Sequence, residues 1–233
     1  MAQTLKINTQ HVAELLPSLT PRMTTKERFR FNLAAQDALD LLAAAYAAQV
    51  RDRGGKTDFR PDICDNLAEL AEALSCASPK LGIICCGQPG NGKTTLLYAF
   101  RRLLNHLRMS GHFRHLAEDN PWFRPAIEIY AAKDIADISR AAPEEYSRIR
   151  NIPMLGIDDL GEEPAEALAY GNAITPVIDL LEHRYNRQLF TFITTNLTPA
   201  QIKQKYGLRL ADRFNEMLHK IIFRGPTFRT ETT

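Results

Sequence analysis

Hydrophobic and polar positions follow two different periods along this chain. Short apolar runs, several of them rich in β-branched residues, predict buried strands at residues 81–86, 126–132, 154–158, 189–195 and 220–223. Between these runs, apolar residues recur three and four positions apart or follow helix-start signals. They predict helices at residues 93–109, 133–140 and 175–185, a helical turn opening at Pro143, and a further segment over 207–217. Strands that alternate with helices predict an α/β fold with a mostly parallel sheet covered on both faces.

The residues before the first strand have a helical pattern of their own. Apolar side chains recur at roughly helical spacing from Phe29 to Val50, after threonines at 24 and 25 that offer N-cap chemistry and before a stop at Gly54. We therefore expect one helix over about residues 24–50 and a shorter one over 65–74. The apolar stripe of the first helix has two readings: it packs on its own chain, or it docks on a partner protein. We predict a division into an N-terminal helical extension and partner-binding segment (1–62) and a main domain (63–233).

Composition limits the function classes only weakly. The chain has 233 residues, of which 45% are hydrophobic, so it can bury a core of its own. Its formal net charge of +2 neither requires nor excludes a nucleic-acid partner. The first residues lack a basic start followed by an apolar core, and no apolar run approaches membrane-spanning length, so we expect a cytoplasmic protein with no membrane partner.

A glycine-rich segment follows the first predicted strand and precedes a helical pattern. Its glycines let successive backbone N–H groups approach phosphate oxygens at the positive end of the helix dipole. Lys93 is expected to neutralise the β- and γ-phosphates, and the hydroxyl of Thr94 to ligate Mg²⁺. This spacing and context predict a P-loop that binds ATP and Mg²⁺. The predicted binding residues are Gly87, Gln88, Pro89, Gly90, Asn91, Gly92, Lys93, Thr94 and Thr95.

Polar side chains end two of the later predicted strands. Asp158 and Asp159 follow an apolar run, and Asn196 follows the next strand. The carboxyl ends of strands in an open α/β sheet face the ligand crevice, so Asp158 is expected to complete the Mg²⁺ shell beside Thr94. Asp159 is then placed to deprotonate or orient an attacking water, with Asn196 as a further group that positions it.

Four motifs together resemble a known family. Gly-Gln-Pro-Gly-Asn-Gly-Lys-Thr (87–94), Leu-Gly-Ile-Asp-Asp-Leu-Gly (155–161), Thr-Thr-Asn (194–196) and Tyr-Gly-Leu-Arg-Leu-Ala-Asp-Arg (206–213) resemble the DnaC/DnaI/IstB group of AAA+ ATPases over about residues 65–230. The resemblance implies an AAA+ P-loop NTPase: a three-layer sandwich with a five-stranded parallel sheet. It also implies a homo-oligomer with ATP bound between neighbouring subunits. Only a short tail follows the last predicted strand, so we expect no C-terminal lid domain.

The resemblance also assigns roles residue by residue. Lys93 and Thr94 match the Walker A positions, Asp158 and Asp159 the Walker B positions, and Asn196 the sensor-1 position. Arg213 matches the arginine finger that reaches the γ-phosphate of the next subunit, and Arg209 is the near alternative. The competing interpretation of either arginine is an exposed ion pair. Arg229 matches a sensor-2 group that contacts phosphate. Many AAA+ proteins carry Glu where this chain has Asp159, so we expect slow hydrolysis.

The resemblance favours a helicase loader that acts as an oligomer on a replicative helicase and single-stranded DNA. A transposition helper with a transposase as partner, a metabolic P-loop kinase and a nucleotide-gated module that hardly hydrolyses stay open as alternatives. The candidate DNA-binding residues follow the second predicted strand, where a solvated helical face is the competing interpretation. They are Lys133, Tyr146, Arg148 and Arg150.

Overall fold

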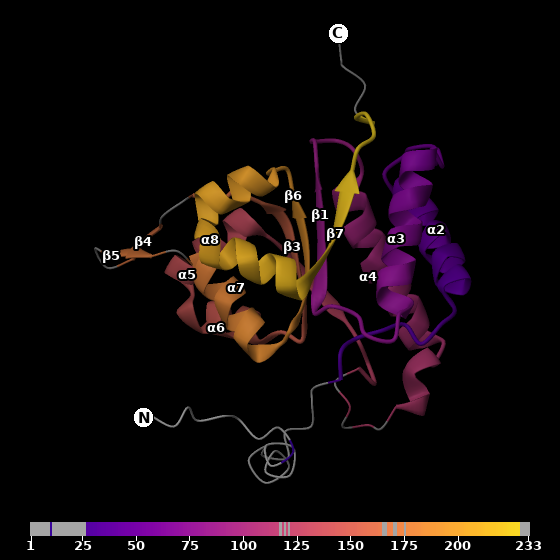
Figure 1. Ribbon diagram of the computed structural model, residues 1–233, viewed down its shortest axis with the longest axis horizontal. Coiled ribbons are helices and arrows are strands. Elements are labelled where there is room, and N and C mark those ends of the chain that lie inside the picture. Colours follow the sequence, from indigo (N-terminus) through magenta and orange to yellow (C-terminus); the bar gives the residue numbers. More distant parts are fainter. Residues whose placement is uncertain are drawn as a thin grey trace, which may run out of the picture.

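Five parallel strands form one sheet in the order β2-β3-β6-β1-β7 (Figure 1). The structure is a computed structural model and describes residues 10, 27–116, 118, 120, 122–164, 167–169, 172–174 and 176–228. The strands of the sheet are β1 (Gly82–Gly87), β2 (Ile127–Ala131), β3 (Met154–Leu160), β6 (Phe190–Thr195) and β7 (Leu218–Phe223). Counted along the chain within this sheet, the order is 2-3-4-1-5, and the five predicted strands are confirmed.

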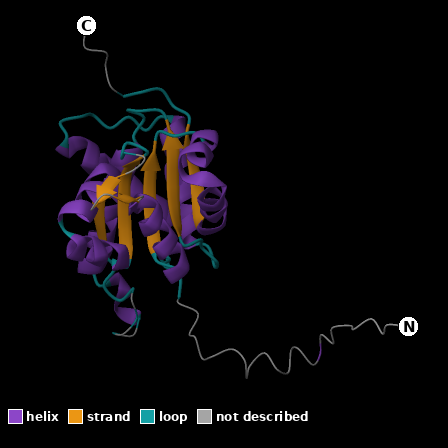
Figure 2. Cartoon of the chain, turned by 90° about the vertical axis from the view of Figure 1, so that its left-hand side faces the viewer, coloured by secondary structure: helices purple, strands orange, loops and turns teal. Residues whose placement is uncertain are grey.

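Helices cover both faces of the sheet, which makes a three-layer α/β fold (Figures 1 and 2). On one face lie α2 (Ala35–Asp52), α3 (Pro61–Ser75) and α4 (Lys93–Met109); on the other lie α5 (Ala132–Ala141), α6 (Pro143–Asn151), α7 (Pro176–Arg187) and α8 (Pro199–Met217). A 3-10 helix, η1 (His112–His115), follows α4, and an antiparallel pair, β4 (Ala167–Ala169) and β5 (Asn172–Ile174), lies between β3 and α7. No helix among the described residues is long and apolar enough to cross a membrane.

The alternation of side chains along β1 divides the core between the two faces. Ile83 and Cys85 join the cluster under α2, α3 and α4, whereas Ile84 and Cys86 join the cluster under α5 to α8. Successive strand residues point to opposite faces, so a strand with helices on both sides must be apolar throughout. This explains why the predicted strands read as continuous apolar runs.

The predicted start of the first helix is wrong: α2 begins at Ala35, about one and a half turns after Phe29. Residues 27–34 are not helical, and Asn32 has a left-handed backbone with φ of 52°. The Phe31 N–H donates to the Leu74 carbonyl at 2.9 Å. Phe29 and Phe31 alternate with Arg28 and Arg30, and this period of two indicates an extended segment. The helical spacing of the apolar residues that follow led the prediction to extend the helix over it.

The apolar stripe of α2 packs within its own chain. Leu42 and Tyr46 are buried in the same cluster as Phe100 of α4 and Leu70 of α3. Of the two alternatives, packing on its own chain therefore holds for the described part of the stripe, which covers α3 and α4. The division at residue 62 stays a prediction, and residues 1–9 and 11–26 of the N-terminal segment lie outside the described residues.

The helix before the last strand is longer than the predicted segment and is kinked. Thr198 caps its start, accepting from the Gln201 N–H while the Gln201 side chain accepts from the Thr198 N–H, and Pro199 occupies the first turn. Gly207 interrupts it with φ of 82° and ψ of 163°. Residues 208–217 therefore form a second half of α8 with its own direction.

Replacing Phe29 by Ala should destabilise the protein by about 3–5 kcal/mol, because a buried aromatic side chain leaves a cavity. Its ring is 1% exposed, and its centroid lies 5.5 Å from those of both Trp122 and Phe190. Urea unfolding measures the change, with Met109→Ala as the control because Met109 is 77% exposed. Equal stability of the two variants would contradict the packing of this segment into the core.

Candidate functional site

The glycine-rich segment forms a phosphate-binding loop between β1 and α4. Gly92 is the N-cap of α4 with φ of 102°, and a Cβ there would lie 2.7 Å from the Tyr46 hydroxyl oxygen. Glycine is therefore required at this position both for its backbone and for its missing side chain. Burial raises the pKa of Tyr46 to about 12, so this hydroxyl is neutral beside the loop.

The ammonium of Lys93 lies inside this loop. Its Nζ donates to the carbonyls of Gly87 and Gln88, both at 2.7 Å, and to Asn91 Oδ1 at 3.1 Å. The Asn91 amide in turn donates to the Phe223 carbonyl at 3.1 Å, which ties the loop to β7. Burial lowers the pKa of Lys93, and the nearby Asp159 carboxylate opposes that change. The loop thus holds one buried cation next to backbone N–H groups at a helix N-terminus, a chemistry suited to phosphate.

Two threonines from different elements meet on the carboxylate of Asp158. Thr94 Oγ1, in the first turn of α4, donates to Asp158 Oδ1 at 3.0 Å, and Thr194 Oγ1 of β6 donates to the same oxygen at 2.5 Å. A hydroxyl and a carboxylate are oxygen ligands of the kind that Mg²⁺ prefers. Thr94 and Asp158 therefore fit the predicted metal position in chemistry and proximity.

A β-bulge separates the directions of the two aspartates. Ile157 pairs with Ile193 but Leu160 pairs with Thr195, so Asp158 and Asp159 together oppose the single residue Thr194. Asp159 has φ of 53°, and its N–H donates to Thr194 Oγ1 at 2.9 Å. Bulges of this kind re-aim side chains at the ends of strands. Here Asp158 meets Thr94 while Asp159 lines the adjacent cavity.

A cavity of about 820 Å³ lies over the phosphate-binding loop. From the predicted site it is lined by Pro89, Gly90, Gly92, Lys93, Thr94, Thr95, Asp159 and Asn196. The structure therefore brings these eight predicted residues together around one cavity, with Asp158 bonded to one of them, Thr94. Their roles stay predictions.

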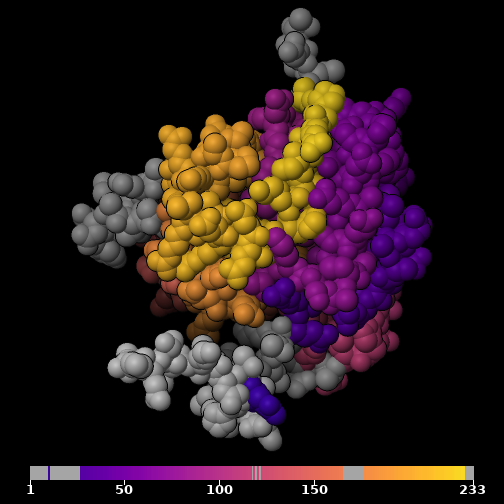
Figure 3. All heavy atoms as spheres, in the orientation of Figure 1, coloured from indigo at the N-terminus to yellow at the C-terminus, as the bar shows by residue number. Residues whose placement is uncertain are grey.

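The rest of the cavity wall was missed by the sequence reasoning. It comes from the end of α2 and the loop after it, from Glu162 beyond β3, and from the C-terminal segment: Tyr46, Val50, Arg53, Gly55, Lys56, Asp58, Glu162 and Phe228. The Phe228 N–H donates to the Gly90 carbonyl at 2.8 Å, and the Arg60 guanidinium lies 3.7 Å from the centre of the Phe228 ring. In Figure 3 the C-terminal segment crosses the molecule in yellow between helices of the two outer layers. No local motif marks these positions, because only tertiary packing brings them to the loop.

The two arginines proposed as fingers lie on α8, and neither lines the cavity of its own chain. Arg213 Nη1 is 2.8 Å from Glu182 Oε1, its guanidinium lies 4.8 Å from the centre of the Tyr185 ring, and its side chain is 14% exposed. Arg209 is 3.5 Å from the same Glu182 oxygen and is 74% exposed. Arg209 is therefore the more accessible of the two in the single chain. Arg229 lies outside the described residues.

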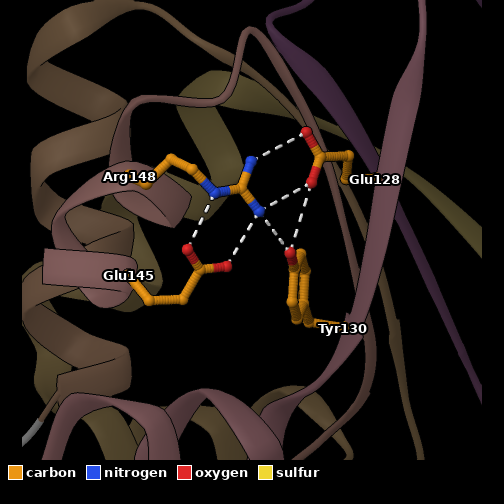
Figure 4. Close-up of polar contacts among 4 residues, drawn as sticks. All are labelled: Glu128, Tyr130, Glu145 and Arg148. Atoms are coloured by element: carbon orange, nitrogen blue, oxygen red, sulfur yellow. Dashed lines mark hydrogen bonds and ion pairs between the residues drawn. The ribbon is translucent and has the colours of Figure 1, made fainter. Parts of the chain in front are cut away.

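The four candidate DNA-binding residues do not form one exposed basic surface. Lys133 is exposed, but the Tyr146 hydroxyl donates to the Pro176 carbonyl at 2.6 Å, and Arg150 lies 5.7 Å from the Tyr146 ring centre. Arg148 is bonded to Glu128, Glu145 and the Tyr130 hydroxyl (Figure 4). Two carboxylates beside one guanidinium reduce what it can offer a phosphate. The DNA-binding role of these residues stays a prediction.

Comparisons with known proteins define the class. No family model and no curated protein matches the sequence. Among solved structures, the DnaC helicase loader matches with a TM-score of 0.54 at 18% identity, over 77% of this chain and 98% of that one. A Streptococcus pyogenes serotype M3 protein, provisionally described as a primosome component, matches with a TM-score of 0.52 at 21% identity, over 73% of this chain and 84% of that one.

The sheet order 2-3-4-1-5, with helices on both faces, is typical of the AAA+ P-loop fold, and the chain has a fold of that type. The predicted likeness to the DnaC group is confirmed as a likeness of fold.

Gly92→Ala should cost about 1–3 kcal/mol in backbone strain, plus whatever the contact with Tyr46 adds, and should weaken ATP binding. Gly54→Ala is the matched control, because Gly54 has φ of 77° with no atom within 4 Å of its added Cβ. Urea unfolding and fluorescence titration with ATP measure the two effects. If Gly92→Ala is no worse than Gly54→Ala in both, the close approach of Tyr46 has no consequence.

Proposed function

We propose that this chain is an ATP-binding and ATP-hydrolysing protein of DNA replication, a helicase loader that works as an oligomer on a replicative helicase and single-stranded DNA. The observation that carries the ATPase part is that Lys93, Thr94 and Asp159 line one cavity, with Asp158 accepting a hydrogen bond from Thr94. The loader part is supported by the motifs and by the likeness of fold to the DnaC helicase loader. The partners are named by that likeness alone.

The proposed mechanism assigns one task to each side chain. Lys93 leaves the loop carbonyls and neutralises the β- and γ-phosphates, while Thr94 and Asp158 hold Mg²⁺, which when bound draws charge from the phosphate oxygens. Asp159 takes a proton from the attacking water, which the Asn196 amide orients. Because transition-state charge spreads over the equatorial oxygens, a guanidinium from a neighbouring copy, that of Arg213 or the more exposed Arg209, completes the site.

Lys93→Ala should abolish detectable ATP binding, since it removes the one lysine that the loop encloses. The matched control is Lys220→Ala, which removes an exposed lysine from β7. Calorimetric titration of both variants with ATP and Mg²⁺ gives the comparison. Ordinary affinity in Lys93→Ala would contradict the phosphate site.

ATP turnover should rise with protein concentration and with single-stranded DNA, and fall as salt is added, because assembly completes the site and DNA phosphates are met by basic side chains. Arg213→Ala should bind ATP almost normally and lose turnover. Mixing it with Asp159→Asn, which should bind ATP without hydrolysing it, should restore some turnover, since that variant supplies Arg213 and Arg213→Ala supplies Asp159.

Turnover that ignores both DNA and protein concentration would contradict the loader and favour a self-contained NTPase or kinase. If every mixture stays inactive, the site is not shared between copies. A pull-down against a replicative helicase and a transposase then separates the loader from the transposition helper.

A further inference from the structure

The loop after β3 carries a buried carboxylate that the proposed mechanism does not use. Glu163 is 5% exposed; its Oε2 accepts from the Gly161 N–H at 2.8 Å, and its Oε1 accepts from the Tyr206 hydroxyl of α8. Lys205 Nζ lies 3.5 Å from the same Oε1 and donates to the carbonyls of Gly161 and Glu163. Burial raises the pKa of Tyr206, and so does the Glu163 carboxylate, which keeps the hydroxyl protonated as a donor. Two consecutive residues of α8 thus hold this loop.

The same loop continues directly from the catalytic aspartates. The Glu162 N–H donates to the Asp159 carbonyl at 3.1 Å, and Thr195 Oγ1 donates to the Leu160 carbonyl at 2.6 Å. A Cβ on Gly161, whose φ is 113°, would lie 2.8 Å from the Leu197 side chain. These contacts restrain the backbone between the bulge and Glu163. A displacement of Asp159 therefore also displaces Glu163.

A hinge in α8 follows Tyr206, which is the partner of Glu163 in the contact between the loop and α8. Gly207 comes immediately after Tyr206, has a non-helical backbone, and has no atom within 4 Å of an added Cβ. Beyond it, the second half of α8 carries Arg209 and Arg213, which are paired with Glu182 of α7 and not with the loop. Tyr206, before Gly207, is therefore bonded to the loop after β3, whereas Arg209 and Arg213, after it, are paired with α7.

We propose that Glu163 and Tyr206 are positioning residues that transmit the nucleotide state of one subunit to the arginines it offers to the next. When ATP displaces the Asp158–Asp159 bulge, the loop pulls the first half of α8 through the Glu163–Tyr206 contact, and α8 bends at Gly207. The two halves then change their angle, which moves Arg209 and Arg213. This inference rests on the proposed function, because it needs a nucleotide at the loop and a neighbouring copy.

Tyr206→Phe removes only the hydroxyl that joins the two elements. Hydrogen exchange of residues 208–217 should change when ATP and Mg²⁺ are added to the parent protein, and Tyr206→Phe should lose this response while keeping the parent affinity for ATP. The matched control is Tyr130→Phe, since the Tyr130 hydroxyl also donates to a glutamate, Glu128, on the edge strand β2 (Figure 4). That variant should keep the response.

Glu163 provides a second route to the same test if Tyr206→Phe does not fold. Glu163→Ala should lose the response. Glu163→Gln should keep it, because an amide oxygen can accept from the Gly161 N–H while the amide N–H₂ donates to the Tyr206 oxygen. If Glu163 were needed only to fill space, Glu163→Ala and Glu163→Gln would show the same hydrogen-exchange response to ATP whenever they bind ATP equally well.

Mixing gives an independent readout. Tyr206→Phe mixed with Asp159→Asn should regain turnover, because the nucleotide site of Tyr206→Phe is intact, while Asp159→Asn binds ATP without hydrolysing it and so moves the arginines that serve that site. A Tyr206→Phe protein that binds ATP but stays inactive in this mixture has a damaged site of its own, which would overturn the inference.

The remaining outcomes separate this inference from the proposed function. A full exchange response in Tyr206→Phe, or a parent protein that binds ATP with no change in residues 208–217, overturns the inference and leaves the ATP site standing. A parent protein that binds no ATP overturns both.

Discussion

The carboxylate of Asp158 accepts hydrogen bonds from two threonines, and the arrangement of the site depends on this contact. Thr94 opens the helix that follows the phosphate-binding loop, whereas Thr194 lies near the end of β6. One oxygen of β3 therefore connects the start of α4, just after the phosphate-binding loop, with the neighbouring strand β6. The same Thr194 hydroxyl accepts from the Asp159 N–H, which fixes the bulge that turns the second aspartate toward the cavity. Chain segments about 100 residues apart are thereby held in register for the same chemistry.

The two layers of helices contribute to the site in different ways. The α2–α4 layer is closed by an aromatic cluster around Phe29 and supplies Tyr46 and Arg53 to the cavity wall. The α5–α8 layer supplies no residue to that cavity and instead presents arginines on α8. The proposed nucleotide site and the exposed Arg209 thus lie on different parts of the molecule, as the proposed action between copies requires. The loop after β3 lines the cavity through Glu162 and contacts the first half of α8 through Glu163.

Charge on this protein is largely used internally. Arg184 is fully buried and donates to the carbonyls of Ile152 and Phe190 and to Thr191, and burial lowers its pKa to about 9. Arg148 is bonded to two glutamates at the β2 edge, an arrangement that also blunts an exposed strand edge. A count of basic residues therefore overstates what the surface offers to a polyanion. The interpretation of residues 133–150 has to take these pairs into account.

Local sequence patterns were enough to predict the five strands of the sheet, most of the helices and the residues of the phosphate-binding loop. These signals are local: periodicity, glycine spacing and a helix start lie within a few residues of one another. The prediction failed at residues 27–34, where Phe29 of an extended segment was counted into a helical stripe. The far wall of the cavity, the bulge that points Asp158 and Asp159 in different directions, and the lower exposure of Arg213 compared with Arg209 are visible only in the folded chain. Each of these depends on contacts between residues far apart in the chain, and no local pattern encodes such contacts.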